Sequence, residues 1–454
     1  MNILHYSLGF PPYRTGGMTK FCMDLMLQQA REGHSVSLLW PGEIFPGCSR
    51  TYIRTHSRRQ GIASYEVLNP TPVPYDEGIT DTDLFIREGS EKTYCSFLQR
   101  LSPDIIHIHT LMGLHKSLLV AAKKQGIRLV FSAHDFFPIC PKVTMFRNGG
   151  VCRTVTDCKQ CAECNLTALS TKKVILLQSR VYEFLKDTPL VKQMRKQHRD
   201  AYLSEAVVKS SVFSEPTRTA EDYQNLRGFY QGLLEMMDVI HYNSSVTMNV
   251  YEAFLRLDGI KKVQIPITHA DINDFRYEKV FENELRISFL GSASAAKGYF
   301  LLKKALDMLW QDPANGRRDF CLNVFFQPED IPAYMKTHDR YHYNQLGEIL
   351  KKTDILVAPS ILYETFGYTV LEAMSYGVPV IVSDHVGAKD IIPDGGGIVL
   401  TDITPEKLAE AIRTLDSRKL CDMNAVIRKQ VRISTIAFMS SEIAEQCYYS
   451  CDYN

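Results

Sequence analysis

The chain has 454 residues, of which 45% are hydrophobic and 23% are charged, and its formal net charge at pH 7 is +1. This length exceeds what one hydrophobic core usually organises, so we expect two domains. The balanced charge argues against nucleic-acid binding, which calls for a basic excess. No apolar run reaches the roughly 20 residues of a membrane span, and the first ten residues lack the pattern of a signal peptide, so we expect a cytoplasmic protein.

The first forty residues predict the opening of a doubly wound α/β sheet. The expected order is strand, loop, helix and strand, at residues 2–8, 9–17, 18–32 and 36–40. The loop ends in Gly16 and Gly17, directly before the helix, where backbone N–H groups and the helix dipole can meet a phosphate. A glycine pair is also a common turn, so its position after the first strand is what favours a phosphate site.

Residues 41–100 are polar and contain three spaced prolines, so we expect an irregular loop region there. Three arginines in it could contact an anionic acceptor, although a solvated basic loop is the simpler interpretation; they are Arg54, Arg58 and Arg59. The sheet is expected to resume with strands at 104–109 and 128–132, separated by an amphipathic helix.

Two histidines stand at the ends of these strands. His109 ends the first strand, and His134 comes just after the second. A histidine near a core is usually structural, but one beyond the carboxyl end of a parallel strand is placed to contact a ligand. We favour His134 over His109 because Asp135 follows it and could orient its ring.

Five of the 12 cysteines cluster within 25 residues and predict one local site; they are Cys140, Cys152, Cys158, Cys161 and Cys164. Spacings of two residues let successive thiolates reach one metal from a tight turn. A structural zinc ion is the first interpretation and an iron–sulfur cluster the second. Four sulfur atoms complete a tetrahedral site, so one of the five cysteines would not bind the metal. The alternative to a metal site is a set of free thiols on a loop.

The middle of the chain, residues 171–237, is charge-rich and predicts helices. One basic cluster could lie on anionic lipid or hold an anionic acceptor, although a solvated helix face is the simpler interpretation. Its members are Lys192, Arg195, Lys196, His198 and Arg199. A strand, a capped helix, a second strand and the interdomain linker are expected to follow, at 238–242, 246–255, 263–267 and 268–274.

The second half repeats the same order of elements. A strand at 285–290 leads into a loop of small residues that includes Gly291 and Ser292, and Lys297 precedes a helix at 300–310. This is not a Walker loop, because the lysine precedes a glycine instead of following one. Small residues still allow close backbone approach to a phosphate, and Lys297 supplies a positive charge. The other expected elements are a strand, three helices and a glycine turn, at 321–325, 343–351, 405–415, 436–449 and 395–397.

The most informative stretch is 354–383. It predicts a buried strand, a loop, a helix that begins at Gly367, a left-handed cap at Gly377 and a second buried strand. Glu364 and Glu372 flank the start of this helix with seven residues between them. Glu364 follows the carboxyl end of a strand, where open α/β sheets bind ligands. The apolar neighbours of Glu372 argue against a merely solvated side chain.

Together these features resemble the retaining nucleotide-sugar glycosyltransferases of the GT-B fold, glycosyltransferase family 4. The most specific part is residues 359–384, where E-T-F-G-Y-T-V-L-E-A-M-x-x-G-x-P-V-I fits the family's pattern of two glutamates separated by seven residues. The resemblance is weakest at 41–100 and 140–235. It implies an α/β protein with two Rossmann-like domains that face each other across a cleft. The first expected unit is an acceptor-side domain at 1–268, with a cysteine-rich insertion at about 140–235. A nucleotide-sugar domain is expected at 269–434. A C-terminal helix at 435–454 is expected to pack back on the first domain.

The resemblance also implies roles for individual residues. Glu364 would hold hydroxyls of the donor sugar, and Glu372 would hold the ribose hydroxyls of the nucleotide. Lys297 would offset charge on the departing diphosphate, and His134 would bind the sugar from the acceptor-side domain. The donor-binding set is completed by Gly16, Gly17, Gly291, Ser292, Thr365, Phe366 and Gly367.

One position departs from the family's pattern. The family often has an arginine directly after the glycine of the second-domain loop, where this chain has Ser292. Losing one charge-assisted hydrogen bond would cost about 1.5–3 kcal/mol. Arg14, Lys303 or the serine hydroxyl itself could compensate.

The resemblance implies metal-independent, retaining transfer of a sugar from a UDP- or GDP-sugar to a glycan or lipid-linked acceptor, in bacterial polysaccharide or glycoconjugate biosynthesis. It implies no cofactor for the chemistry and a cytoplasmic enzyme with peripheral contact at the inner face of the membrane. Because no residue suggests itself as a nucleophile, we expect the departing phosphate to take the acceptor proton. The alternatives are a nucleotide-sugar epimerase of the same architecture and a non-catalytic nucleotide-sugar-binding protein.

Overall fold

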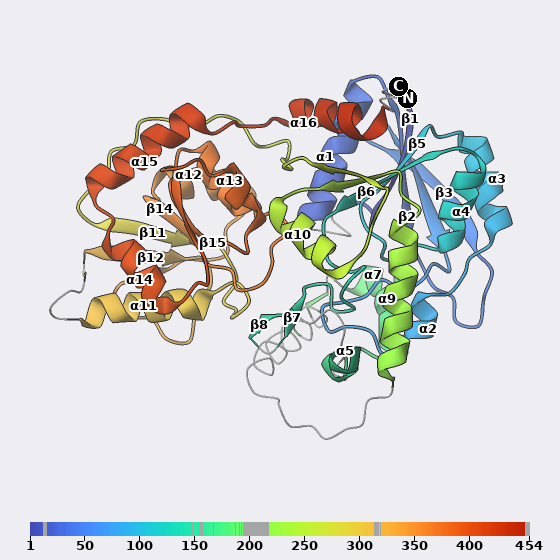
Figure 1. The fold of residues 1–454 in the computed structure, drawn as a ribbon, viewed down its shortest axis with the longest axis horizontal. Coiled ribbons are helices and arrows are strands. Elements are labelled where there is room, and N and C mark those ends of the chain that lie inside the picture. Colours follow the sequence, from blue (N-terminus) through green and yellow to red (C-terminus); the bar gives the residue numbers. More distant parts are fainter. Residues whose placement is uncertain are drawn as a thin grey trace.

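The computed structural model of this chain describes residues 1–11, 16–147, 149–153, 158–166, 168–186, 188–189, 191, 193, 218–312, 317 and 319–449. Within these ranges the chain forms two α/β halves that lie side by side, each built on a sheet of mostly parallel strands (Figure 1). The α/β class and the two Rossmann-like units expected from the sequence are confirmed.

The first sheet has eight strands in the order β10-β9-β6-β5-β1-β2-β4-β3. They are β1 (Asn2–Tyr6), β2 (Ser35–Pro41), β3 (Tyr52–Arg59), β4 (Ile62–Leu68), β5 (Ile105–Ile108), β6 (Arg128–Ala133), β9 (Val239–Tyr242) and β10 (Lys261–Gln264). Neighbouring strands pair in parallel, except that β3 is antiparallel to β4. The central strands are buried, as expected when helices cover both faces of a sheet.

The prediction of an irregular region at 41–100 was wrong. This region forms the hairpin of β3 and β4 and the helices α2 (Thr82–Phe85) and α3 (Glu91–Leu101). β3 is one of the two edge strands of the sheet, and polar or charged residues make up most of it. Edge strands commonly carry such residues because they discourage pairing with other chains, so their polarity conceals the strand pattern.

The second sheet has six parallel strands in the order β13-β12-β11-β14-β15-β16. They are β11 (Leu285–Phe289), β12 (Phe320–Val324), β13 (Met335–Thr337), β14 (Ile355–Ala358), β15 (Val380–Ser383) and β16 (Gly397–Leu400). The two edge strands, β13 and β16, were not predicted, because they are short and one begins within the expected glycine turn. A separate hairpin joins β7 (Phe146–Arg147) to β8 (Gly150–Val151) in the first half.

Helices cover both sheets in the part of the chain that the structure describes. In the first half these are α1 (Gly17–Arg31), α4 (Lys116–Lys124), α5 (Cys158–Cys164), α6 (Thr171–Leu177), α7 (Arg180–Leu185), α9 (Ala220–Leu234) and α10 (Ser245–Phe254). In the second half and at the end of the chain they are α11 (Tyr299–Gln311), α12 (Leu346–Lys351), α13 (Tyr368–Ser375), α14 (Pro405–Arg413), α15 (Ser417–Gln430) and α16 (Ile436–Ile443), with a π-helical turn η3 (Ala444–Tyr448). None of the described helices combines the length and apolar character needed to cross a bilayer.

α15 was missed in the sequence. Its buried apolar residues are Leu420, Met423 and Ile427, which have helical spacing. The polar residues between these three positions make the apolar stripe of the helix hard to recognise in the sequence.

The last elements of the chain return to the first half, where α16 lies beside α1 (Figure 1). The hydroxyl of Ser440 donates to the carboxylate of Glu32 at 2.7 Å, and Nε of Arg128 donates to the carbonyl of Cys447 at 2.8 Å. One apolar cluster therefore draws residues from both halves: α1 contributes Phe21, α13 contributes Met374 and α16 contributes Met439.

The chain crosses between the halves twice, once after β10 and once after α15. Arg276 lies on the first crossing, and its guanidinium donates to the carbonyls of Ile427 and Val431 at 2.7 and 2.8 Å, where α15 ends. Asp274 pairs with the same guanidinium at 2.6 Å. The two crossings are therefore fastened to each other.

The loop between β11 and α11 is fastened to the segment that follows β14. The carbonyl of Ala296 accepts hydrogen bonds from the amides of Ile361 and Leu362 at 2.9 and 3.1 Å. Gly298 has a left-handed backbone with φ of +75°, and a Cβ on it would lie 1.9 Å from the carbonyl oxygen of Pro359. Glycine is therefore required at this point for the loop to dock.

We expect Gly298→Ala to lower the free energy of unfolding more than Gly259→Ala does. Both glycines have φ of +75°, so alanine costs about 1–2 kcal/mol of backbone strain at either position. A Cβ at Gly259 meets no atom within 4 Å, whereas at Gly298 the clash with Pro359 should add about 1–3 kcal/mol. Urea unfolding of the two variants measures the difference, and equal losses would show that this contact does not hold the loop.

Candidate active site

The start of α13 is the centre of the candidate site. Gly367 precedes the helix with φ of +102°, and a Cβ on it would lie 2.8 Å from the Val386 side chain. The helix residues from Val370 to Ser375 are buried. Phe366 is also buried, and its carbonyl accepts a hydrogen bond from the amide of Ala388 at 2.6 Å. A close glycine turn and a buried helix thus fix where the first amides of α13 point.

Lys297 and Glu364 form an ion pair at this helix start, with Nζ and Oε2 2.9 Å apart. The backbone of Glu364 is held on both sides, because its amide donates to the carbonyl of His385 and its carbonyl accepts from the amide of Gly387, each at 3.0 Å. Both side chains remain partly exposed, at 36% and 18%. A cation and a carboxylate are therefore presented together to an incoming ligand.

Thr365 joins this helix start to the first half of the protein. Its hydroxyl donates to the carbonyl of His134 at 3.2 Å. Its own carbonyl accepts from the hydroxyls of Ser244 and Thr247, at 2.6 and 3.0 Å, at the beginning of α10. His134 and the Lys297–Glu364 pair, which were chosen from opposite halves of the sequence, thus come to the same place.

Gly17 also approaches α13 from the first half. A Cβ on Gly17 would lie 3.1 Å from the ring of Tyr368, the first residue of the helix, and Gly16 has φ of +129°. The loop end and the helix start therefore pack closely. Residues 12–15, which include the proposed compensating Arg14, lie outside the described residues.

Glu372 lies further along α13 and is only 7% exposed. Its Oε1 is 3.4 Å from Nε2 of His269, which is also 3.4 Å from the hydroxyl of Tyr343. Burial and the nearby Glu372 carboxylate raise the pKa of Tyr341 to about 12. These neighbours of Glu372 were not predicted, because His269 falls in the stretch expected as a linker and the tyrosines of that region form no distinctive pattern.

The second-domain loop offers fewer charges than the family pattern. The hydroxyl of Ser292 lies 3.1 Å from that of Ser294, and Gly291 packs against the ring of Phe289. Lys303 pairs with Asp307 and Asp330, at 2.9 and 3.0 Å, so two carboxylates already lie against its charge.

Asp135 does not orient His134, so that expectation was wrong. The Asp135 carboxylate accepts from the hydroxyl of Thr110 at 3.1 Å and from the amide of Phe137 at 2.9 Å. Burial raises the pKa of Asp135 to about 6. The ring of His134 instead contacts His109, with Nε2 and Nδ1 3.3 Å apart. The sequence signal for this histidine contact was the alternation in the DIIHIH strand, because residues two apart in a strand, such as His107 and His109, lie on the same face.

His134 adjoins a group of buried histidines beneath the site. Burial lowers the pKa of His5 and His241 to about 4 and that of His134 to about 3, and those of His107 and His109 lie well below the usual value. All five rings are therefore neutral at pH 7. In the described ranges, one group of three potential metal ligands has its ligand atoms within 4.8 Å of one another, and it consists of ring nitrogens of His5, His107 and His109.

The five clustered cysteines gather on one side of the first half, around β7, β8 and α5. None of them forms a disulfide. A hydrogen bond with Cys158 and burial raise the pKa of the Cys161 thiol, and burial beside Cys164 and Cys152 raises the pKa of Cys140 to about 11. The thiols are thus neighbours, but no three of these described sulfur atoms lie within 4.8 Å of one another. All five members of the basic cluster between 192 and 199 lie outside the described residues.

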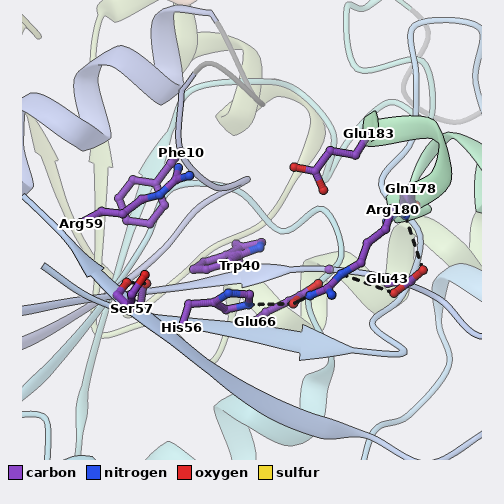
Figure 2. Close-up of a pocket in the computed structure, with 12 residues that line it drawn as sticks. Phe10, Trp40, Glu43, His56, Ser57, Arg59, Glu66, Gln178, Arg180 and Glu183 are labelled. Carbon is purple, nitrogen blue, oxygen red and sulfur yellow. Dashed lines mark hydrogen bonds and ion pairs between the residues drawn. The ribbon is translucent and has the colours of Figure 1, made fainter. Parts of the chain in front are cut away.

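A polar pocket of about 200 Å³ lies where β2, β3 and β4 meet α7 (Figure 2). The buried Glu66 carboxylate accepts from His56 at 2.8 Å, from Arg54 at 3.1 Å and from Arg180 at 3.4 Å. Trp40 lies between this cluster and Phe10, and Glu183 reaches from α7 toward the same space (Figure 2).

The three arginines lie on strand β3 and not in a loop, and Arg58 and Arg59 are exposed, as expected for solvated side chains. Arg54 binds Glu66, Arg59 stacks over the Phe10 ring at 5.3 Å, and Arg58 donates to the carbonyl of Gly61 at 3.0 Å.

Comparison with solved structures defines the class of this fold as GT-B. WaaG, a glycosyltransferase involved in lipopolysaccharide biosynthesis, matches 98% of this chain and 99% of its own with a TM-score of 0.52 and 14% identity. Sucrose-phosphate synthase from Thermosynechococcus elongatus matches 98% of each chain with a TM-score of 0.53 and 13% identity. Anabaena HepE, solved in complex with UDP and glucose, matches 98% of each chain with a TM-score of 0.52 and 14% identity.

Two family models match the sequence. The model described as Glycosyltransferase Family 4 matches residues 15–151, and the model described as Glycosyl transferases group 1 matches residues 327–432. The chain belongs to the family 4 glycosyltransferases with the GT-B fold.

Matches to curated relatives are partial and span less than half of each relative. An uncharacterized glycosyltransferase of Methanocaldococcus jannaschii is 27% identical over 168 residues, which is 34% of this chain and 42% of the relative. A GDP-mannose-dependent alpha-(1-6)-phosphatidylinositol dimannoside mannosyltransferase of Mycobacterium tuberculosis is 33% identical over 87 residues, which is 19% of this chain and 22% of the relative.

We expect stability to fall as the pH drops from 7.5 to 5, because unfolding lets the buried histidines take up protons. The unfolded pKa is about 6.5 and the folded pKa of His5 and His241 is about 4, so the loss begins near pH 6.5. Each of the two should contribute about 2 kcal/mol of that loss at pH 5. Urea unfolding across this range measures it: His241→Gln should flatten the dependence, and replacement of the exposed His338 by glutamine should not.

Proposed function

We propose that this protein is a retaining glycosyltransferase that moves a sugar from a nucleotide diphosphate sugar to a hydroxyl acceptor. The observation that carries the proposal is the Lys297–Glu364 pair at the start of α13, beside the contact of Thr365 with His134. Cation, carboxylate, helix amides and histidine are the groups that a sugar diphosphate requires at its phosphate and sugar ends.

The donor is proposed to lie along α13, with its diphosphate at Lys297 and the helix amides. Glu364 would hold sugar hydroxyls, and the buried Glu372 would hold the ribose together with its neighbours. A UDP- or GDP-sugar is the proposed donor. In support, the HepE structure contains UDP, and the mycobacterial relative is named as GDP-mannose-dependent.

The proposed chemistry follows from where charge develops. Breaking the glycosyl–phosphate bond builds negative charge on the diphosphate, which Lys297 and the N–H dipoles of α13 would stabilise without a metal. Glu364 is paired with Lys297, and Asp135 accepts hydrogen bonds from Thr110 and Phe137, so neither carboxylate is poised as a nucleophile. We propose front-face transfer, in which the new bond to the acceptor oxygen forms as the phosphate leaves and a phosphate oxygen takes the acceptor proton.

The acceptor is proposed to be a glycan whose terminal sugar occupies the pocket around Trp40. A volume of about 200 Å³ is below the roughly 300–1,000 Å³ of pockets for drug-sized ligands, which favours one sugar ring. The ring face of Trp40 and the carboxylates of Glu66, Glu43 and Glu183 offer an apolar surface and hydroxyl acceptors.

Bacterial polysaccharide or glycoconjugate synthesis is the proposed setting, supported by the description of WaaG. A lipid-linked acceptor and peripheral contact with the membrane remain part of this proposal.

A structural zinc ion on four of the five clustered cysteines is a separate proposal, with an iron–sulfur cluster as the second choice. The thiol donor set fits either group. The sulfur atoms would have to draw closer, because no three of the described ones lie within 4.8 Å. Metal analysis of the purified protein tests this directly.

We expect one sugar nucleotide of a UDP and GDP panel to raise the melting temperature strongly, because a ligand bound only to the folded state stabilises it. Glu372→Ala should abolish that shift by removing the acceptor of the ribose hydroxyls, and Lys297→Ala should lower kcat by about 10²-fold or more. Lys304→Ala, an exposed lysine on the neighbouring helix α11, serves as the control and should leave both unchanged.

Three outcomes of product analysis with the stabilising sugar nucleotide would contradict the transfer mechanism. An inverted anomeric product, identified by NMR, would exclude retention. Conversion of the sugar nucleotide without any acceptor would favour an epimerase, and binding without turnover would favour a non-catalytic role.

We expect Trp40→Ala to raise KM for the acceptor about tenfold while the donor-induced melting shift stays unchanged, because an aromatic contact contributes about 0.5–1.5 kcal/mol. Tyr52→Ala is the control, since Tyr52 is an exposed aromatic residue of β3 that does not line the pocket. Equal acceptor kinetics in wild type and Trp40→Ala would remove the pocket from the proposed acceptor site.

A further inference from the structure

A single file of hydrogen-bonded groups runs inward from His134 and ends at a backbone carbonyl. Except for His134 its side chains are buried. In order, the contacts are His134 Nε2–His109 Nδ1 (3.3 Å), His109 Nε2–His5 Nδ1 (2.9 Å), His5 Nε2–Gln29 Oε1 (2.8 Å), Gln29 Nε2–Tyr448 Oη (2.9 Å), Tyr448 Oη–His107 Nδ1 (2.7 Å), His107 Nε2–Ser132 Oγ (2.7 Å), Ser132 Oγ–His241 Nδ1 (2.7 Å) and His241 Nε2–Ile265 O (2.8 Å). We call this set the histidine file.

The inner end of the file fixes where the first protons lie. The Ile265 carbonyl can only accept, so Nε2 of His241 must carry a proton. His241 is neutral, because burial lowers its pKa to about 4, so its Nδ1 is an acceptor. Ser132 has one hydroxyl proton and gives it to His241, which means that it accepts from a protonated Nε2 of His107.

The same accounting continues through the middle of the file. Nδ1 of His107 accepts the hydroxyl proton of Tyr448, so the Tyr448 oxygen accepts from the amide nitrogen of Gln29. The amide oxygen of Gln29 then faces His5 and accepts from its Nε2. Nδ1 of His5 is left as an acceptor, and it receives the proton on Nε2 of His109.

At the outer end, Nδ1 of His109 can only accept, so Nε2 of His134 donates. A neutral His134 then has its lone pair on Nδ1. In the part of the chain that the structure describes, no protein group bonds this atom, although the ring of Phe21 lies beside the imidazole at 4.7 Å between centroids.

We propose that the histidine file holds His134 in the Nε2–H tautomer, with Nδ1 free to accept a hydrogen bond from a hydroxyl of the donor sugar. Tyr448 and Ser132 act as positioning residues, because each joins His134 to the Ile265 carbonyl that sets the direction of every bond between them. The identity of the ligand rests on the proposed function; the tautomer does not.

The opposite direction of all hydrogen bonds in the file is disfavoured at its inner end. Reversing every bond would leave Nε2 of His241 unprotonated against the Ile265 carbonyl, so two acceptors would face each other. The file also argues against a metal among His5, His107 and His109. All six of their ring nitrogens already take part in hydrogen bonds of the file, and a metal would break it.

The test is the tautomer of His134 in the full-length protein labelled with ¹⁵N-histidine. Long-range ¹H–¹⁵N spectra distinguish a protonated from an unprotonated ring nitrogen, and His134→Gln assigns the signals. We expect a protonated Nε2 and an unprotonated Nδ1 at pH 7. A protonated Nδ1 would overturn the proposal, and so would loss of the histidine signals into a metal complex on addition of zinc at one equivalent.

Two variants test the positioning role. Tyr448→Phe and Ser132→Ala each cut the path to Ile265, so we expect His134 to show a mixture of both tautomers. The kcat/KM for the donor should fall about three- to tenfold, as for loss of one hydrogen bond. A single, unchanged His134 tautomer in both variants would overturn the role; if one variant does not fold, the other decides.

Tyr94→Phe is the matched control. Tyr94 donates to or accepts from Nδ1 of His115 at 2.8 Å, an equally buried tyrosine–histidine contact outside the file. This variant should leave the His134 signals unchanged. If no donor supports turnover, the proposed function fails while the spectra still decide the tautomer.

Discussion

The candidate site depends on one constraint, the anchoring of the amino-terminal end of α13 by both halves of the protein. The Thr365 carbonyl accepts two hydroxyl protons from the start of α10, and its hydroxyl bonds the backbone of His134. Gly17 packs against the next turn. Because orphan amides at a helix start are useful to a phosphate only when they are fixed and reachable, the position of α13 also decides where Lys297 and Glu364 can act.

Local sequence was sufficient for the core of each half. The strands and helix of 354–383 follow from apolar runs, a glycine cap and helical spacing, and none of these needs knowledge of distant residues. The hairpin of β3 and β4 could not be found in this way, since its outer strand is polar and pairing with β2 creates the buried face. The apolar stripe of α15, formed by Leu420, Met423 and Ile427, is narrow and is interrupted by polar residues, so it gives only a weak helix signal in the sequence.

In the candidate site, too, residues with a local sequence pattern were predictable and residues defined by distant contacts were not. Lys297 and Glu364 were identified from short-range patterns, and the structure brings them within 2.9 Å. The partners of other residues are long-range and were not predictable: His269 approaches Glu372 from the linker, and His109 replaces Asp135 as the neighbour of the His134 ring. Burial made the difference for Asp135, whose carboxylate is taken up by Thr110 and Phe137. Proximity in sequence says little about which groups share a hydrogen bond.

The contact of Arg276 with the end of α15 has a mechanical consequence. Two separate chain segments connect the halves, and this guanidinium ties them together at the carbonyls of Ile427 and Val431. Two bodies linked through adjacent, mutually bound segments keep one favoured axis of rotation and lose most sliding and twisting motions. Any opening of the halves to admit a nucleotide sugar would then be a hinge rotation about an axis near the two crossings. The largest displacement would occur at the edge farthest from Arg276.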